Sequence, residues 1–241
     1  MRSDCTAILI LAIDTTTGNG SLALARGADL LQCREVQAPQ AFSRVLFREI
    51  QSLLERHRLA LKDIDLYAAA AGPGSFTGVR VGLASVKGLA VAHGRKVVPV
   101  SNLAATAWQA PPGPRILIPV LDARRKEVYA GVYERVANPE AEGPLRPLME
   151  ETVGSPAALE ERLSGLDLPL ADTAYCGPDV DRLPLARFPR LLTARALAPA
   201  VAELAWIACR RGQVLGPEAV DANYIRRSDA EIFFREPGKT R

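Results

Sequence analysis

Two stretches of the chain share one pattern, and that pattern constrains the fold more than any other feature. Residues 8–25 read ILILAIDTTTGNGSLALA, and residues 116–134 read ILIPVLDARRKEVYAGVYE. Each is an apolar strand that ends in an aspartate, followed by a polar turn and a second apolar strand. Asp14 and Asp122 take matching places in the two stretches. Together with a similar order of elements in the two halves, this indicates an internal duplication.

The predicted elements of the first half follow a known order. Strands are predicted over residues 7–13, 21–25, 30–36, 64–71 and 96–100, and helices over residues 41–57, 79–93 and 102–109. Three consecutive strands followed by alternating helices and strands form the core of ribonuclease-H-like and actin-like folds. Fold analogy of this kind does not establish a function.

The second half follows the proline-rich segment APPGPR, residues 110–115, a candidate linker. After the repeated pattern come strand candidates over 145–149 and 174–176, a helix that opens at Ser155–Pro156, and a helix over 198–211 that Gly212 ends. We therefore predict a duplicated α/β fold of the ribonuclease-H-like/actin-like (ASKHA) class. Its two lobes, residues 1–109 and 110–241, each hold a mixed sheet flanked by helices.

Composition argues against several classes of protein. The 241 residues are 48% hydrophobic, enough for a sizeable core, and a net charge of +3 is too small to indicate nucleic-acid binding by itself. The four cysteines form no CxxC pair, and the two histidines are not spaced as metal ligands. The apolar run at residues 7–13 is too short to cross a bilayer. We expect a cytosolic protein with reduced thiols and no metal site.

The loop GPGSFTG, residues 72–78, is the most distinctive short segment. Its glycines are spaced GxGxxxG, one residue longer than the dinucleotide-binding pattern. A phosphate-binding loop ends in Gly-Lys-Ser/Thr, whereas Gly78 is followed by Val79 and Arg80. Backbone N–H groups at the start of a helix attract anions. We nevertheless favour a tight connection, in which glycines supply unusual backbone angles and Pro73 supplies stiffness.

The helix predicted after this loop contains Gly82 and Gly88, each of which costs about 1 kcal/mol relative to alanine. A ridge of small side chains offers a reason: Ala84, Gly88 and Ala92 recur at helical spacing, with Val81 and Ser85 beside them. Such a ridge lets another helix approach to about 8 Å. The approaching helix is either residues 41–57 of the same chain or a helix of another chain, and sequence alone favours the first.

A candidate nucleotide site is formed by Asp14, Thr15, Thr16, Gly72 and Gly74. In actin-like kinases an aspartate and a hydroxyl-rich hairpin at this place hold magnesium and phosphate, and Asp122 would be the equivalent in the second lobe. Two simpler explanations stay open. Asp14 can cap its own turn, and the cations that follow Asp122 can neutralise it.

Five segments resemble one family of bacterial proteins. They are LILAIDTTT (9–17), GPGSFTGVRVGLASVKGLA (72–90), SNLAA (101–105), LDARRKEVY (121–129) and ANYIRR (222–227). The second segment is very specific, and together the five span nearly the whole chain. In these segments the chain resembles the TsaB (YeaZ) family, whose members take part in making threonylcarbamoyladenosine on tRNA.

The resemblance implies an actin-like scaffold subunit of two lobes that pairs with a larger paralogue, TsaD. The paralogue is expected to hold the metal and to transfer the threonylcarbamoyl group to the tRNA adenosine beside the anticodon. An ATPase subunit, TsaE, joins the assembly. The subunit itself is then expected to have no independent activity, to require no cofactor, and to meet tRNA through the complex, with ATP and metal bound by its partners.

The resemblance also implies an interface. In relatives, the helix after the glycine loop and the helix before it pair with their counterparts on the partner. The positions carried over are Phe42, Val45, Val81, Ala84, Ser85, Gly88 and Ala92. Family members often have His-Ser where this chain has Phe42–Ser43, and phenylalanine neither binds metal nor moves protons, which favours a packing role. An exposed apolar seam would also permit a homodimer of the isolated subunit.

Other classes of function are weighed against this one. A small actin-like kinase or ATPase would use Asp14 and Asp122, and calorimetry with ATP would reveal it. A peptidase is disfavoured because the sequence lacks a set of metal ligands. A direct tRNA-binding module would use Arg124, Arg125, Lys126, Arg226 and Arg227, although isolated basic pairs are usually solvated surface.

Overall fold

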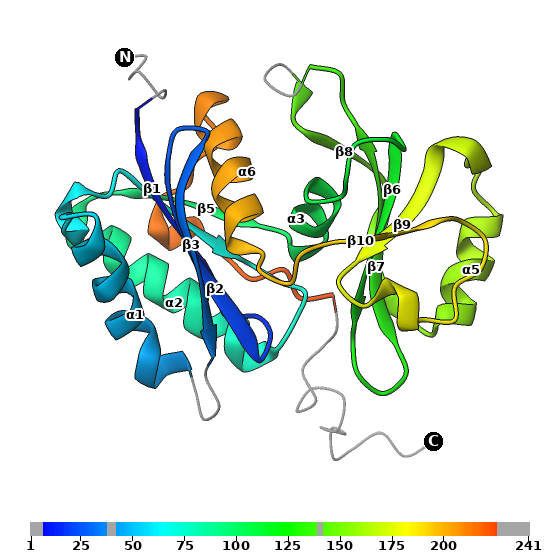
Figure 1. Cartoon of the computed structure of the whole chain (residues 1–241), viewed down its shortest axis with the longest axis horizontal. Coiled ribbons are helices and arrows are strands. Elements are labelled where there is room, and N and C mark those ends of the chain that lie inside the picture. The colour runs from blue at the N-terminus through cyan, green and yellow to red at the C-terminus, as the bar shows by residue number, and fades with distance from the viewer. Residues whose placement is uncertain (1–6, 38–41, 139–141, 226–241) are drawn as a thin grey trace, which may run out of the picture.

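The computed structural model describes residues 7–37, 42–138 and 142–225 and forms two lobes that lie side by side (Figure 1). The first lobe is built on a five-stranded sheet of order β3-β2-β1-β4-β5. Its strands are β1 (Leu9–Asp14), β2 (Asn19–Arg26), β3 (Asp29–Gln37), β4 (Leu66–Ala70) and β5 (Lys96–Val100). The first three strands pair antiparallel, and β4 and β5 are added parallel to β1.

The second sheet repeats this arrangement. Its order is β10-β9-β6-β7-β8, and its strands are β6 (Ile116–Asp122), β7 (Val128–Arg135), β8 (Leu145–Gly154), β9 (Thr173–Gly177) and β10 (Arg190–Leu192). When β6 is matched to β1, every strand has the same neighbours and the same direction of pairing as in the first sheet. The predicted duplication and the two-lobed fold are confirmed.

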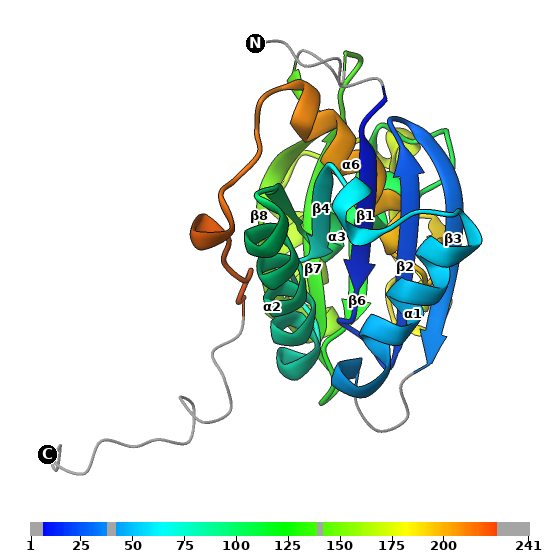
Figure 2. The ribbon, with the colours of Figure 1, turned by 90° about the vertical axis from the view of Figure 1, so that its left-hand side faces the viewer.

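Helices cover both faces of each sheet. They are α1 (Phe42–Arg56), α2 (Phe76–His93), α3 (Asn102–Trp108), α5 (Pro156–Ser164) and α6 (Ala198–Arg210). Helices α1 and α2 lie on the outer face of the first sheet (Figure 2), and α5 lies on the outer face of the second. Helices α3 and α6 fill the space between the two sheets. Strand β1 is therefore buried on both faces, which explains its continuous apolar sequence.

The two inner helices cross between the lobes. Helix α3 follows the last strand of the first sheet, but it packs on β6 and β7 of the second. Helix α6 follows the last strand of the second sheet and packs on β1 and β2 of the first. Each sheet thus depends on a helix from the other half of the chain. The division into domains 1–109 and 110–241 stays a prediction.

Some element boundaries differ from those predicted, and one strand was missed. Helix α2 begins at Phe76 rather than at residue 79, because the Ser75 hydroxyl caps it by accepting a hydrogen bond from the N–H of Gly78 at 3.3 Å. Strand β8 continues to Gly154, beyond the apolar residues that predicted it, because β7 pairs with its whole length. Strand β10 was not predicted; it has only three residues, at the edge of its sheet.

After α6 the chain returns across both lobes. Leu215 forms a bridge with Val97 beside the first sheet, and Val220 packs into the core under α1 and α2. The N–H of Asn223 then donates to the carbonyl of Ala71 at 2.8 Å. Ile225 packs against the inner core of the second lobe. In the described part of the chain, no helix is long and apolar enough to span a membrane.

Candidate functional site

The turn after β1 and the glycine loop before α2 are in direct contact at the ends of their strands. The N–H of Ser75 donates to the carbonyl of Thr16 at 2.8 Å, and the Thr15 hydroxyl donates to the carbonyl of Gly78 at 2.7 Å. Both threonines are 1% exposed. The start of the polar turn is therefore buried, and its first two hydroxyls face the protein.

Asn102 completes this contact, and sequence reasoning missed it. Its side-chain amide donates to the Thr16 hydroxyl at 2.6 Å and to the carbonyl of Pro73 at 3.0 Å. Its amide oxygen accepts from the N–H of Gly72 at 3.1 Å. Asn102 is the second residue after β5, and its amide at the end of a buried strand, inside the SNLAA segment, is the signal that could have found it. Asn102 thus ties together Thr16 and Gly72, two residues of the candidate nucleotide site.

Three glycines are required by this close approach. A Cβ atom on Gly74 would lie 2.8 Å from the carbonyl oxygen of Thr16, and one on Gly78 would lie 2.0 Å from that of Thr15. A Cβ on Gly82 would lie 2.7 Å from the Thr15 hydroxyl oxygen. The contact of α2 with the turn offsets the cost of Gly82 inside the helix. The glycines of the loop serve a tight connection, as favoured from the sequence.

Asp14 lies at the end of β1 and is 1% exposed. Its Oδ1 accepts hydrogen bonds from the N–H of Thr16 at 2.8 Å and from the Thr16 hydroxyl at 2.6 Å. Its Oδ2 is buried and has no hydrogen-bond partner among the described residues. Burial raises the pKa of this carboxyl above its ordinary value, and the bonds from Thr16 oppose that rise only in part. Asp14 caps its own turn, one of the explanations left open by the sequence.

Asp122 takes the equivalent position at the end of β6, but in different surroundings. Its carboxylate is about half exposed and accepts from the N–H of Arg124 at 2.8 Å, while the Arg124 guanidinium lies 3.5 Å away. Asp14 is therefore a buried capping group, whereas Asp122 forms a solvated ion pair with Arg124. No group of three or more His, Cys, Asp or Glu side chains that could hold a metal ion occurs among residues 7–37, 42–138 and 142–225.

The ridge of small residues on α2 faces outward. Ala84, Gly88 and Ala92 are exposed, and Val91 on the same side of the helix is 69% exposed. A Cβ atom on Gly88 would have nothing within 4 Å. The expectation that α1 of the same chain fills this ridge is therefore wrong at Gly88. Helices α1 and α2 lie next to each other on the sheet (Figure 2), but α1 does not cover this side of α2.

Helix α1 adds one large apolar side chain to the surface. Phe47 is 52% exposed, while Leu46, Ile50 and Leu53 of the same helix are buried against the sheet. Phe47 and Val91 were missed from the sequence because they lie off the apolar stripes that predicted the two helices. We call the exposed set Phe47, Ala84, Gly88, Val91 and Ala92 the outer seam.

Other positions carried over to the interface point inward. Phe42 is 8% exposed, and its ring occupies the space that a Cβ on Gly20 would need. Ser85 is also 8% exposed and donates to the carbonyl of Val81 at 2.7 Å. Val45 and Val81 are partly buried against the same core. These four residues can support the helices that carry the outer seam, and their place in an interface stays a prediction.

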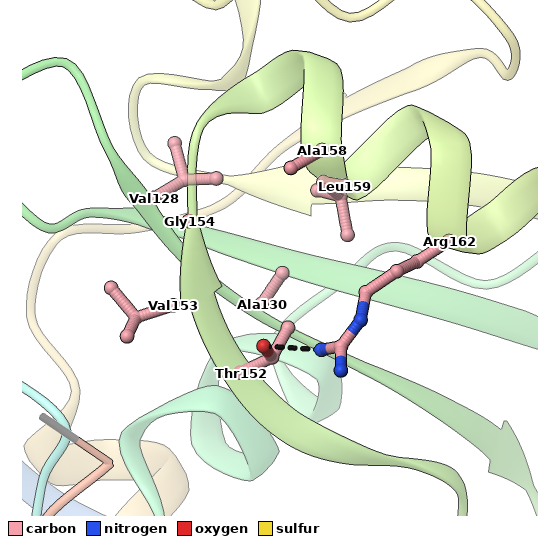
Figure 3. Close-up of a pocket in the computed structure, with 8 residues that line it drawn as sticks. All are labelled: Val128, Ala130, Thr152, Val153, Gly154, Ala158, Leu159 and Arg162. Carbon is pink, nitrogen blue, oxygen red and sulfur yellow. Dashed lines mark hydrogen bonds between the residues drawn. The ribbon is translucent and has the colours of Figure 1, made fainter.

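The second lobe has a small hollow of its own (Figure 3). It measures about 170 Å³ and lies between β7, β8 and α5. Figure 3 shows the Arg162 side chain crossing one side of it, where its guanidinium donates to the Thr152 hydroxyl. Val128, Ala130 and Leu159 form much of the remaining lining. None of the candidate site residues borders this hollow.

Comparison with known proteins identifies the family. The chain is 31% identical over 239 residues to the tRNA threonylcarbamoyladenosine biosynthesis protein TsaB of Escherichia coli K12, which covers 95% of this chain and 99% of that protein. The chain belongs to the TsaB (YeaZ) family. TsaB of Haemophilus influenzae is 36% identical over 124 residues, which cover 51% of this chain and 52% of that protein.

Solved structures and a family model agree with this membership. The solved structure of YeaZ from Pseudomonas aeruginosa superposes with a TM-score of 0.74 at 32% identity, covering 90% of this chain and 99% of that chain. The family model described as "TsaD: tRNA N6-adenosine threonylcarbamoyltransferase" matches residues 36–165. Those residues include α1, α2 and the repeated strand pair of the second lobe. Members of the TsaB family are named for the biosynthesis of threonylcarbamoyladenosine in tRNA.

Proposed function

We propose that this chain is a non-catalytic subunit in the biosynthesis of threonylcarbamoyladenosine, and that it acts by docking a TsaD-like paralogue through α1 and α2. In this role it is required for transfer of the threonylcarbamoyl group to the tRNA adenosine beside the anticodon. The partner holds the metal, and a TsaE-like ATPase joins the complex. The assembly works in the cytoplasm.

The outer seam is the observation that carries this proposal. Phe47 and Val91 expose apolar surface, and Ala84, Gly88 and Ala92 expose only small side chains on α2. Small residues permit a helix of another chain to approach closely, and exposed aromatic side chains are frequent anchors of protein interfaces. A pair of helices with this surface is suited to pairing with two helices of the partner.

The turn after β1 supports a structural rather than a chemical role. The carboxyl of Asp14 and the hydroxyls of Thr15 and Thr16 are hydrogen-bonded to neighbouring residues of the chain. A kinase or ATPase that used this turn would have to break those bonds at the two hydroxyls and at Oδ1 of Asp14, and would have to open the buried turn to reach Oδ2. We therefore propose that the subunit needs no cofactor of its own and that ATP is bound by its partners.

Reconstitution of the modification tests the role of the subunit. Unmodified tRNA is incubated with the paralogue, the ATPase subunit and the substrates of the pathway, with or without this chain. We expect modified adenosine only when the chain is present, and no turnover of ATP by the chain alone. Modification at the full rate without it, or ATP hydrolysis by the isolated chain, would contradict the proposal.

The same seam offers a second pairing. Two copies of this chain can bury it against each other when the paralogue is absent, because an exposed apolar face favours self-association. If one surface serves both pairings, the paralogue must compete with the homodimer. Sedimentation of the chain with increasing amounts of paralogue is then expected to show the homodimer replaced by the heterodimer. A larger assembly that contains two copies of this chain together with the paralogue would show that the two interfaces are separate.

A further inference from the structure

The turn between β6 and β7 has an unusual backbone. Three consecutive residues, Arg124, Arg125 and Lys126, have φ values of 62°, 55° and 63°. Left-handed angles are unfavourable for residues with a Cβ atom, and glycine, asparagine and aspartate are the usual residues in such turns. Backbone strain of this kind concentrates at functional sites. The chain keeps three long basic side chains where smaller residues would fold more easily.

The turn displays these cations together. All three residues are exposed, and the Arg124 side chain is 85% exposed. Hydrogen bonds from the N–H of Ala123 to the carbonyl of Glu127, and from the N–H of Glu127 to the carbonyl of Arg124, both 2.9 Å long, close the turn. The carboxylate of Asp122 holds the N–H of Arg124. The turn is therefore ordered, with its basic side chains at its tip.

We propose that this turn contacts the phosphate backbone of tRNA. Arginine and lysine side chains at a protruding, ordered turn are suited to phosphate contacts, which position RNA without reading its sequence. The choice of RNA as the polyanion rests on membership of a family named for a tRNA modification. The turn lies at the end of the second lobe, away from α1 and α2 on the first (Figure 1). RNA contact and partner docking thus use different lobes.

Binding of an unmodified tRNA transcript to the full chain, measured at several salt concentrations, tests this contact. The test variant replaces Arg124, Arg125 and Lys126 together by glutamine, which keeps side chains of similar reach. We expect binding to weaken about tenfold at low salt, and the slope of log K against log salt to fall by about 2 to 3, because each lost phosphate contact removes about one released counterion.

A matched pair of single variants separates RNA contact from strain. Arg125 and Arg58 are both exposed and both have a φ of 55°. Replacing either by glycine removes one positive charge and relieves the same backbone strain. We expect neither Arg125→Gly nor Arg58→Gly to lower the melting temperature. Only Arg125→Gly is expected to weaken tRNA binding and to reduce the salt slope, by about 1.

Three results would overturn the proposal. The first is no tRNA binding by the unaltered chain at low salt. The second is a glutamine variant that binds tRNA as the unaltered chain does. The third is equal loss of binding in Arg125→Gly and Arg58→Gly, which would show a general effect of net charge. Because the measurement uses the chain without its paralogue, its failure leaves the docking proposal standing.

Discussion

Asp14 and Asp122 end equivalent strands of the duplicated unit, yet one is buried and the other is about half exposed. Their equivalence could be predicted, because an apolar strand that ends in an aspartate occurs twice in the sequence. The burial of the turn at Asp14 could not, because this turn packs on Asn102 and on the start of α2, which are distant in the sequence. The same limit explains why a nucleotide site was considered at Thr15 and Thr16.

The raised pKa of Asp14 predicts how stability depends on pH. The folded chain holds the proton of this carboxyl more tightly than the unfolded chain, whose Asp has its ordinary pKa near 3.8. The favourable contribution of Asp14 is therefore complete below that pH and is lost as pH rises through the raised pKa of the folded state. Asp14→Asn cannot titrate, so its free energy of unfolding should rise relative to the unaltered chain as pH increases from 4.

Urea unfolding of both proteins between pH 4 and pH 8 measures this difference. All other titrating groups are shared, so the difference reports on Asp14 alone. A difference that stays constant over the whole range would show that burial does not raise the pKa of this carboxyl.

Gly78 and Gly88 occupy the same helix and should respond to alanine in opposite ways. A methyl group on Gly78 would lie 2.0 Å from a backbone oxygen of Thr15, and neither backbone can move without disturbing its strand or helix. We expect Gly78→Ala to lower the free energy of unfolding by about 3 kcal/mol. A methyl group at position 88 would have no atom within 4 Å, so Gly88→Ala should raise the free energy of unfolding by about 1 kcal/mol. Denaturant titration compares the two, and equal effects would mean that α2 does not approach the turn so closely.

Among the elements, periodicity predicted every strand of the two sheets except the short edge strand β10, and the helices that cover the sheets. It could not show that α3 and α6 exchange lobes, because a helix that packs on the next sheet has the same apolar pattern as one that packs on its own. The path of the C-terminal segment also could not be predicted from the sequence. Residues 213–225 have no regular period, and the hydrogen bonds that Leu215 and Asn223 make go to parts of the chain far away in sequence.

Glu151 of β8 holds the C-terminal segment, residues 213–225, in place through hydrogen bonds. Its carboxylate accepts from the side-chain amide of Asn223 at 2.6 Å and from the hydroxyls of Ser101 and Tyr133. Burial, and next the charge of Glu151, raise the pKa of Tyr133, so this hydroxyl stays a donor at neutral pH. One side chain thereby joins β7, β8, the start of α3 and the C-terminal segment.

Glu151→Ala should loosen that segment selectively. Hydrogen bonds to a charged carboxylate contribute about 1.5 to 3 kcal/mol each, so the variant should lose about 2 kcal/mol of local stability. The amide of Asn223 is then expected to exchange with deuterium faster, while amides in the middle of α1 keep their rate. Unchanged exchange at Asn223 would mean that its bond to Ala71 alone holds the segment.

At the scale of the whole molecule, the two copies of the repeated unit have diverged where function is proposed. The first copy places the long helix α2 between its two parallel strands, β4 and β5. The second copy has only a short 3₁₀ turn, Val180–Arg182, between β9 and β10. Within residues 7–37, 42–138 and 142–225, the paired helices with small exposed residues therefore occur on the first lobe alone, and the basic turn of three left-handed residues on the second alone.

This asymmetry matches the two proposed tasks, partner docking by the first lobe and RNA contact by the second. The sequence indicated both features, as a ridge around Gly88 and as a basic run after Asp122. Only the structure shows that the ridge is open to solvent and that the basic run has a strained backbone. An interface cannot be predicted from the sequence alone, because an apolar residue such as Phe47 is as frequent in a core as on a docking surface.

Docking through the outer seam is tested by measuring how well the Gly88→Leu variant retains the TsaD-like paralogue. Gly18→Leu is the matched control, since Gly18 is also exposed and a Cβ there meets nothing within 4 Å. Leucine at position 88 should stabilise α2 by about 1 kcal/mol, so any loss of pairing cannot be ascribed to unfolding. We predict that Gly88→Leu lowers retention at least about tenfold while Gly18→Leu binds normally. Equal retention of the paralogue by both variants would contradict docking through the outer seam.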